Sequence, residues 1–372
     1  MIPEGDNVEA AETPETWAIA GTERSSETDT AGDAPPAAAR RIFLACLLYA
    51  SGAALVWLFF ALTGRDGGLF FSHYQLDRET VVRIATSFAI FWFGWGWLWY
   101  RLKRMLLRRV VGLSEQELAE NFASRMGTPF DLSALLARHS ERRIRIVDMI
   151  TRRGRTLIPL LAGFIFFYFH ISKDPGPESL AFGIQDNFLD AIVLCAAMLG
   201  SYYSNGFVGR VFYGAHARIM DGKLGRANAL AIGTMWTLFK FVMIPIGLRL
   251  AAVFPPDTYA ALFVFIWVTY IVGDALSEIV GALFGRQALR VWGIGEVNRK
   301  SVAGTWACFL GSLAVCVAVV LARHLPLPWL GLAVVVSAAN TATELLSPRG
   351  TDDFTMATTS ALLCWGFGVL VY

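Results

Sequence analysis

Residues Thr258–Phe284, TYAALFVFIWVTYIVGDALSEIVGALF, decide the fold class of this chain. The stretch is apolar and long enough to cross a lipid bilayer as a helix, which requires about 20 such residues. Its unusual feature is Asp274, which is followed by Glu278 about one helical turn later. A charged side chain inside a membrane span costs about 2.5–3.5 kcal/mol on insertion scales, so such residues usually serve a function. The stretch therefore predicts a membrane helix that carries part of a functional site.

The composition of the whole chain points to the membrane as well. Hydrophobic residues make up 55% of the sequence and charged residues only 17%. Nine apolar stretches follow residue 40, and most are close to the length that spans a bilayer. They lie at about 41–63, 80–100, 157–172, 187–208, 229–254, 258–284, 301–322, 328–346 and 354–372. We therefore expect an all-α, polytopic membrane protein with about nine transmembrane helices and cytoplasmic amphipathic helices.

The charge distribution divides the chain into three regions. Residues 1–39 contain nine acidic residues and one arginine without apolar periodicity, which is typical of a disordered acidic tail. Residues 40–156 combine two predicted transmembrane helices with a basic segment. Residues 157–372 hold the remaining spans and the residues suited to chemistry, so we expect the functional core there.

The basic segment, residues 101–155, sets the expected orientation. It carries thirteen basic and six acidic residues, which predicts a cytoplasmic location for the segment and for the N-terminus. We expect residence in a bacterial inner membrane. Ser114 and Glu117 have the spacing of a helix capping box. Apolar and arginine residues alternate further on, which favours amphipathic helices on the anionic inner leaflet, with direct contact of some arginines to a nucleotide as an alternative. We expect no nucleic-acid binding, because the positive-inside rule already accounts for these charges.

Carboxylates and basic residues meet at the predicted inner ends of the later spans. Asp274 and Glu344 lie at similar depths in their helices, and Asn340 shares a helix face with Glu344. Oxygen ligands with positive charge nearby suit a magnesium–nucleotide site. Lys300 and Ser301 begin the next span, where a helix N-terminus favours phosphate. The alternative is that the basic residues only anchor the helix at the boundary.

Three strings in the last hundred residues resemble the polyprenol kinases, a family that includes dolichol, phytol and CTP-dependent diacylglycerol kinases. The strings are Gly273-Asp274-Ala275-(x5)-Gly281-(x2)-Phe284-Gly285, Arg299-Lys300-Ser301-x-x-Gly304-Thr305-(x3)-Phe309 and Thr343-Glu344-x-x-Ser347-Pro348-(x3)-Asp352-x-x-Thr355. The chain departs from the family at Ala303, where an acidic residue is usual. The family's upstream R-K-x-x-H string is reduced to Arg152-Arg153, with Thr156 in place of the histidine.

The resemblance implies an enzyme that transfers the terminal phosphate of CTP, with Mg²⁺, to a lipid alcohol. It assigns catalytic roles to Asp274, Glu344, Asp352 and Asp353, metal binding to Asp274, Glu344 and Asp352, and nucleotide binding to Arg286, Arg299, Lys300, Ser301 and Arg349. Asp353 or Glu278 would orient the lipid hydroxyl. A cytidylyltransferase that acts on a lipid phosphate, and a non-catalytic scaffold or transporter, remain alternatives. The sequence names neither the lipid nor the oligomeric state.

Overall fold

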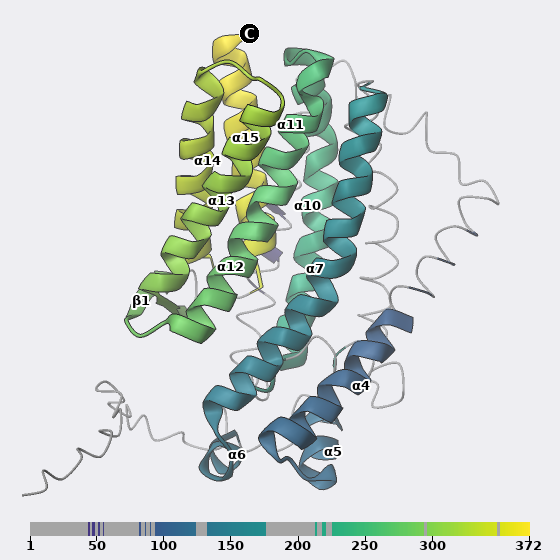
Figure 1. Ribbon diagram of the computed structural model, residues 1–372, viewed down its shortest axis with the longest axis vertical. Helices are drawn as coiled ribbons and strands as arrows, with labels where there is room; N and C mark the ends of the chain where they lie inside the picture. The colour runs from purple at the N-terminus through teal and green to yellow at the C-terminus, as the bar shows by residue number, and fades with distance from the viewer. Residues whose placement is uncertain are drawn as a thin grey trace, which may run out of the picture.

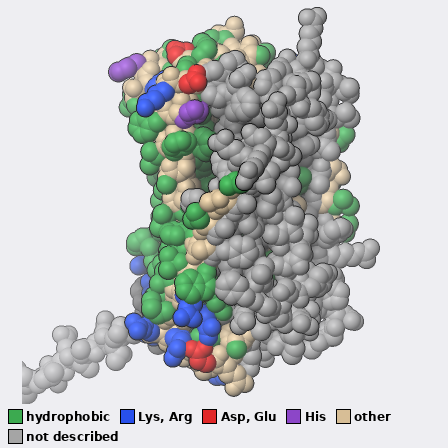
Figure 2. All heavy atoms as spheres, turned by 90° about the vertical axis from the view of Figure 1, so that its right-hand side faces the viewer, with side chains coloured by type: hydrophobic (Ala, Val, Ile, Leu, Met, Phe, Trp, Pro, Cys, Tyr) green, Lys and Arg blue, Asp and Glu red, His purple; other side chains and the backbone are tan. Residues whose placement is uncertain are grey.

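The computed structural model describes residues 94–123, 132–175, 225–293, 296–347 and 350–372, together with residues 218–220 and a few single positions. Most of these residues form long helices that lie side by side along the long axis of the molecule (Figure 1). Figure 2 shows hydrophobic side chains along the middle of this bundle and Lys and Arg side chains gathered at its lower end. This distribution suits a protein embedded in a bilayer.

Five helices in the described part of the chain are long and apolar enough to cross a membrane. They are α7 (Glu141–Lys173), the helix Pro256–Phe284, α13 (Val302–Ala322), α14 (Pro328–Leu346) and α15 (Asp352–Val371). The helix Pro256–Phe284 runs through η5 (Pro256–Thr258), α11 (Tyr259–Phe263), η6 (Val264–Val268) and α12 (Thr269–Phe284). These helices confirm the expectation of a mainly helical, multi-pass protein.

The number of spans stays a prediction. A further helix, α10 (Gly225–Val253), follows the predicted stretch 229–254. The predicted stretches 41–63 and 187–208 lie almost wholly outside the described residues, as does the predicted acidic tail. The structure therefore supports a helical membrane protein without testing the count of nine.

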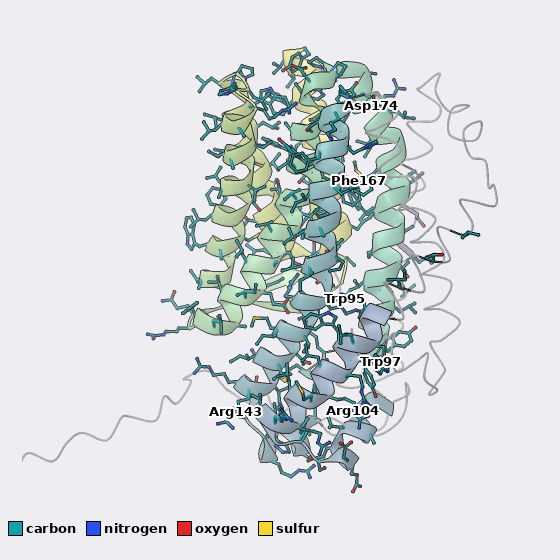
Figure 3. All side chains as sticks on the ribbon, turned by 45° about the vertical axis from the view of Figure 1, so that its right-hand side comes forward. Trp95, Trp97, Arg104, Arg143, Phe167 and Asp174 are labelled. Atoms are coloured by element: carbon teal, nitrogen blue, oxygen red, sulfur yellow. The ribbon has the colours of Figure 1, made fainter. Side chains whose placement is uncertain are left out.

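Helix α7 continues across the region boundary predicted at residue 156. Its second half is the predicted span 157–172, and its first half belongs to the basic segment. Pro159 lies inside this helix without ending it. Figure 3 shows its two ends, with Arg143 at the lower end and Asp174 at the opposite end. Arg152 and Arg153 are therefore fixed to the same helix as the apolar span, about one turn before it.

The basic segment has a small hydrophobic core of its own. Helices α4 (Gly96–Leu106), η2 (Leu107–Val111), α5 (Glu115–Ala123), α6 (Leu132–Arg138) and the start of α7 bury apolar residues against one another. Members of this core include Leu107, Leu118, Leu135, Ile144 and Val147. Leu135, Ile144 and Val147 were predicted to face the leaflet. They pack inside the protein instead, because neighbouring helices cover these apolar faces.

The predicted capping box is confirmed. The backbone N–H of Ser114 donates to Glu117 Oε2 at 2.8 Å, and the N–H of Glu117 donates to Ser114 Oγ at 3.2 Å. The first of these bonds, helped by His139, holds the pKa of Glu117 at about 2. Helix α5 therefore begins where the sequence predicts.

Two strands between α12 and α13 are an addition to the predicted all-α fold class. Strands β1 (Ala288–Gly293) and β2 (Glu296–Ser301) form an antiparallel hairpin. Leu289 pairs with Lys300, and Ala288 pairs with Ser301. This register places Lys300 and Ser301 immediately before α13 (Figure 1). The hairpin therefore delivers a basic residue to a fixed point at one end of the bundle.

Glycines bring α12 and α13 close together. A Cβ atom added at Gly304 would lie 2.7 Å from the carbonyl oxygen of Ser277 and 3.4 Å from the Cα of Gly281. Gly281 and Gly304 both belong to the strings that resemble the kinase family. Their small size lets the two backbones touch, which holds the carboxylates of α12 beside the end of the hairpin.

We expect Gly304→Ala to lower the free energy of unfolding by about 1–3 kcal/mol, because the backbone of Ser277 cannot move aside easily. The measurement is unfolding of the purified protein in detergent micelles. Gly331→Ala is the matched control, since a Cβ there meets open space. That variant should keep or slightly raise the stability, because alanine is the better helix former. Equal stability of the two variants would contradict the close approach.

Candidate functional site

Arg153 of α7 joins both acidic residues of α12. Its Nη1 donates to Asp274 Oδ2 at 2.5 Å, and its Nη2 donates to the backbone carbonyl of Asp274 at 3.3 Å. Its Nε donates to Glu278. Asp274 and Glu278 share a face of α12 because they are four residues apart. The arginine therefore compensates the carboxylates whose burial the sequence left unexplained.

Two further arginines surround Glu278. Arg152 Nη2 lies 2.5 Å from Glu278 Oε2, and Arg218 Nη2 lies 3.3 Å from Glu278 Oε1. With Arg153, three positive charges face the two negative charges of Asp274 and Glu278. Guanidinium groups gathered in this way suit the phosphate oxygens of a nucleotide.

A buried ion pair fixes the segment that carries Arg218. Lys103 Nζ lies 2.8 Å from Asp148 Oδ1, and both side chains are almost fully buried. The other carboxylate oxygen of Asp148 accepts the backbone N–H of Ile219 at 2.8 Å. Asp148 thus connects α4, α7 and the residue next to Arg218. This network sets where the third guanidinium meets Glu278.

An ion pair between β2 and α14 lies next to the arginine contacts of α12. Lys300 Nζ of β2 lies 2.5 Å from Glu344 Oε1 at the end of α14. Ser277 of α12 donates to the same oxygen at 3.1 Å. The side chain of Glu344 is 3% exposed, against 25% for Lys300. The lysine therefore reaches toward the surface while the carboxylate is enclosed.

Lys300 links the arginine–carboxylate contacts of Asp274 and Glu278 to the ion pair with Glu344. Burial alone would lower its pKa, but the carboxylates of Glu344 and Asp352 raise the pKa of Lys300 above its ordinary value, with a smaller contribution from Asp274. Asp353 interacts electrostatically with Arg153. We call the whole set the charge cluster: Arg152, Arg153, Arg218, Asp274, Glu278, Lys300, Glu344, Asp352 and Asp353.

The start of α15 is fixed against the end of α14. The hydroxyls of Ser347 and Thr355 lie 2.5 Å apart, and Gly350 has a φ of 79° in the connection between the helices. A positive φ favours glycine. The contact between Ser347 and Thr355 brings Asp352 and Asp353 to the same end of the bundle as Glu344.

The N-terminus of α13 is partly capped. Ser301 Oγ accepts the backbone N–H of Gly304 at 3.1 Å, and the N–H of Val302 donates to the carbonyl of Gln287 at 3.0 Å. The sequence predicted that free N–H groups at this helix terminus would bind phosphate. Two of these groups already have partners, so Lys300 is a stronger candidate for a phosphate ligand than the helix terminus.

The predicted metal ligands do not converge on one point. Within the part of the chain that the structure describes, no group of three or more His, Cys, Asp or Glu side chains could hold a metal ion. Asp274 pairs with Arg153, whereas Glu344 pairs with Lys300. The oxygen donors are nevertheless of the kind that Mg²⁺ takes. This ion is often bound by only one or two carboxylates together with substrate phosphates and water.

The remaining predicted nucleotide ligands are placed only in part. Arg286 is exposed in the turn after α12. The backbone of Arg299 pairs with Arg290 across the hairpin. Arg349 lies outside the described residues. Of the predicted basic residues, Lys300 is thus the one that the structure brings into the charge cluster.

Three members of the cluster were not among the predicted site residues. Arg152 and Arg153 lay in the basic segment and the reduced upstream string, and Arg218 had no predicted role. The available signal was the reduced R-K-x-x-H string at Arg152-Arg153, directly before an apolar span. Nothing in the sequence pointed to Arg218, because its contact with Glu278 depends on the tertiary fold.

Comparisons with known proteins add no relative. The chain matches no family model, and searches among curated proteins and solved structures gave no match.

Proposed function

We propose that the chain is a membrane-embedded lipid-alcohol kinase that transfers the terminal phosphate of CTP to a polyprenol, a phytol-like alcohol or a diacylglycerol at the cytoplasmic face. One observation supports this most. Residues from all three strings that resemble the polyprenol kinases, and the arginines of the reduced upstream string, lie in one charge cluster at one end of an apolar bundle. A water-soluble nucleotide and a lipid headgroup can meet only at such an end.

The ion pairs of the cluster suggest how a magnesium nucleotide would bind. The arginines now neutralise Asp274 and Glu278, and Lys300 neutralises Glu344. The arginines and Lys300 would pair with the phosphates of a bound nucleotide, and Asp274, Glu344 or Asp352 would hold its Mg²⁺. Mg²⁺ supplies charge neutralisation at the phosphates when bound.

The transfer step follows from the same residues. The lipid hydroxyl oxygen would attack the terminal phosphorus, the bond from phosphorus to the bridging oxygen would break, and CDP would leave. The hydroxyl proton would pass to a carboxylate. Asp353 suits that role better than Glu278, because three arginines engage Glu278 while no ion pair to Asp353 is found among the described residues. The products are a lipid phosphate monoester and CDP.

A non-catalytic scaffold is the second candidate, and one observation favours it. Intramembrane carboxylates are costly without a partner, and a metal ion is one such partner. Arg153 and Lys300 supply compensation without any metal. An activity measurement must therefore decide between the two.

The test uses the purified protein in lipid–detergent micelles with Mg²⁺, γ-labelled CTP and a panel of polyprenol, phytol and diacylglycerol. A kinase moves label into the organic phase, and Asp274→Asn abolishes the transfer. Phosphatidate with α-labelled CTP tests for a cytidylyltransferase, which would release pyrophosphate and retain the label in the lipid. A folded protein that labels no lipid in either assay would support the scaffold.

A further inference from the structure

Two fully buried side chains near the charge cluster each carry a polar atom that has no hydrogen-bond partner among the described residues. They are the hydroxyl of Tyr270 on α12 and the amide nitrogen, Nδ2, of Asn340 on α14. Both residues are 0% exposed. Buried polar groups are nearly always hydrogen-bonded, and an unpaired one calls for an explanation such as a ligand.

Both groups lie about one helical turn inside the cluster. Tyr270 precedes Asp274 by four residues, and Asn340 precedes Glu344 by four. Helices α12 and α14 both end at the cluster, so each residue lies roughly 6 Å deeper in the bundle than its carboxylate. A layer of unpaired donors thus follows the layer of charges toward the membrane interior.

The orientation of Asn340 is fixed by a neighbour on α15. Ser360 Oγ donates to Asn340 Oδ1 at 2.8 Å, which leaves Nδ2 as the group without a partner. An amide nitrogen can only donate, so a partner for Nδ2 must be a hydrogen-bond acceptor. A lipid carbonyl or ether oxygen is such an acceptor.

The hydroxyl of Tyr270 lies in the field of the acidic residues. Tyr270 lies one turn before Asp274 on the same face of α12, and its hydroxyl has no hydrogen bond to Asp274 or Asp353. A hydroxyl group placed between Tyr270 and Asp353 could accept from the phenol and donate to the carboxylate. That is the arrangement which an attacking alcohol requires.

We propose that Tyr270 and Asn340 bind the headgroup of the acceptor lipid, and that this headgroup carries an oxygen acceptor besides its reacting hydroxyl. Tyr270 holds the reacting hydroxyl, and Asn340 holds an ester carbonyl. Glycerol esters such as diacylglycerol have both groups, whereas a simple polyprenol has only the hydroxyl. This inference rests on the proposed kinase function and narrows its substrate class.

Three variants test the subsite. Tyr270→Phe removes only the hydroxyl, and Asn340→Leu removes the donor at similar volume. Tyr259→Phe is the control, because that buried tyrosine donates to the carbonyl of Ala251 at the other end of the same continuous helix. Initial rates with γ-labelled CTP are measured for a diacylglycerol and for a polyprenol. The binding of dioctanoylglycerol is measured separately by its effect on thermal unfolding.

We expect Asn340→Leu to lower kcat/KM for diacylglycerol by about tenfold or more, mostly through KM, and to leave the polyprenol rate unchanged. Tyr270→Phe should lower kcat for both acceptors, and Tyr259→Phe should change neither. An unchanged ratio of the two acceptors in Asn340→Leu, or a parent protein that prefers polyprenol, would overturn the inference.

The binding measurement separates this inference from the kinase proposal. A parent protein that transfers no phosphate, yet is stabilised by dioctanoylglycerol in a manner that Asn340→Leu abolishes, would keep the lipid subsite and reject the kinase. A parent protein that phosphorylates diacylglycerol, with no effect of either variant on rate or binding, would keep the kinase and reject the subsite.

Discussion

Replacing Lys300 by methionine should lower the free energy of unfolding by about 3–5 kcal/mol. Glu344 is the reason, since its carboxylate is 3% exposed and its one ion pair in the described part of the chain is with Lys300. Removing one partner of a buried ion pair leaves an uncompensated charge, and this cost exceeds the net value of the pair itself. Chemical unfolding in detergent micelles, followed by tryptophan fluorescence, measures the loss.

The reverse replacement gives the control. Glu344→Gln should cost less than Lys300→Met, because the lysine is 25% exposed and can turn its ammonium group toward water. The double variant should regain most of the stability, since neither charge is then left alone. Equal losses in the two single variants, without recovery in the double variant, would show that the pair contributes little.

The apolar spans could be predicted from the sequence because they depend on local composition. The run Thr258–Phe284 and the helices α13, α14 and α15 follow from length and hydrophobicity alone. The start of α7 could not be found this way, because its first half is basic and its apolar residues pack against α4 and α5. The pairing of the two strands within residues 288–301 was also not predicted from the sequence. These two strands are only six residues each, and they are held by pairing with each other and by packing at the end of α14.

The candidate site was predictable to a similar degree. The positions of Asp274 and Glu344 in their spans predicted similar depths. Ser277, three residues after Asp274 on α12, does contact Glu344 on α14. Their actual partners were not predictable. Arg153 and Asp274 are 121 residues apart in sequence, and no periodicity connects them. A charge in a membrane helix indicates that a partner exists, but only the packing of α7 on α12 identifies it.

Arg153→Lys should leave the protein folded and slow phosphoryl transfer by about 10²–10³-fold. The lysine keeps a positive charge beside Asp274, so the fold retains its compensation, and Arg152 and Arg218 still hold Glu278. An ammonium group cannot reproduce the planar fork with which the guanidinium reaches both carboxylates. If the arginine turns to the phosphates when the nucleotide binds, the loss of this fork removes stabilisation of the transferring group.

Two further variants of α7 serve as controls for Arg153→Lys. Arg145→Lys changes another arginine of α7 that pairs with Glu141 on an exposed surface, and it should alter neither stability nor rate, because such pairs contribute little. Arg153→Leu removes the charge entirely and should unfold the protein or cost about 3–5 kcal/mol, because Asp274 then lacks a partner. Full activity in Arg153→Lys would reduce Arg153 to a charge partner of Asp274. The phosphate-binding role would then have to rest on Lys300 and Arg218.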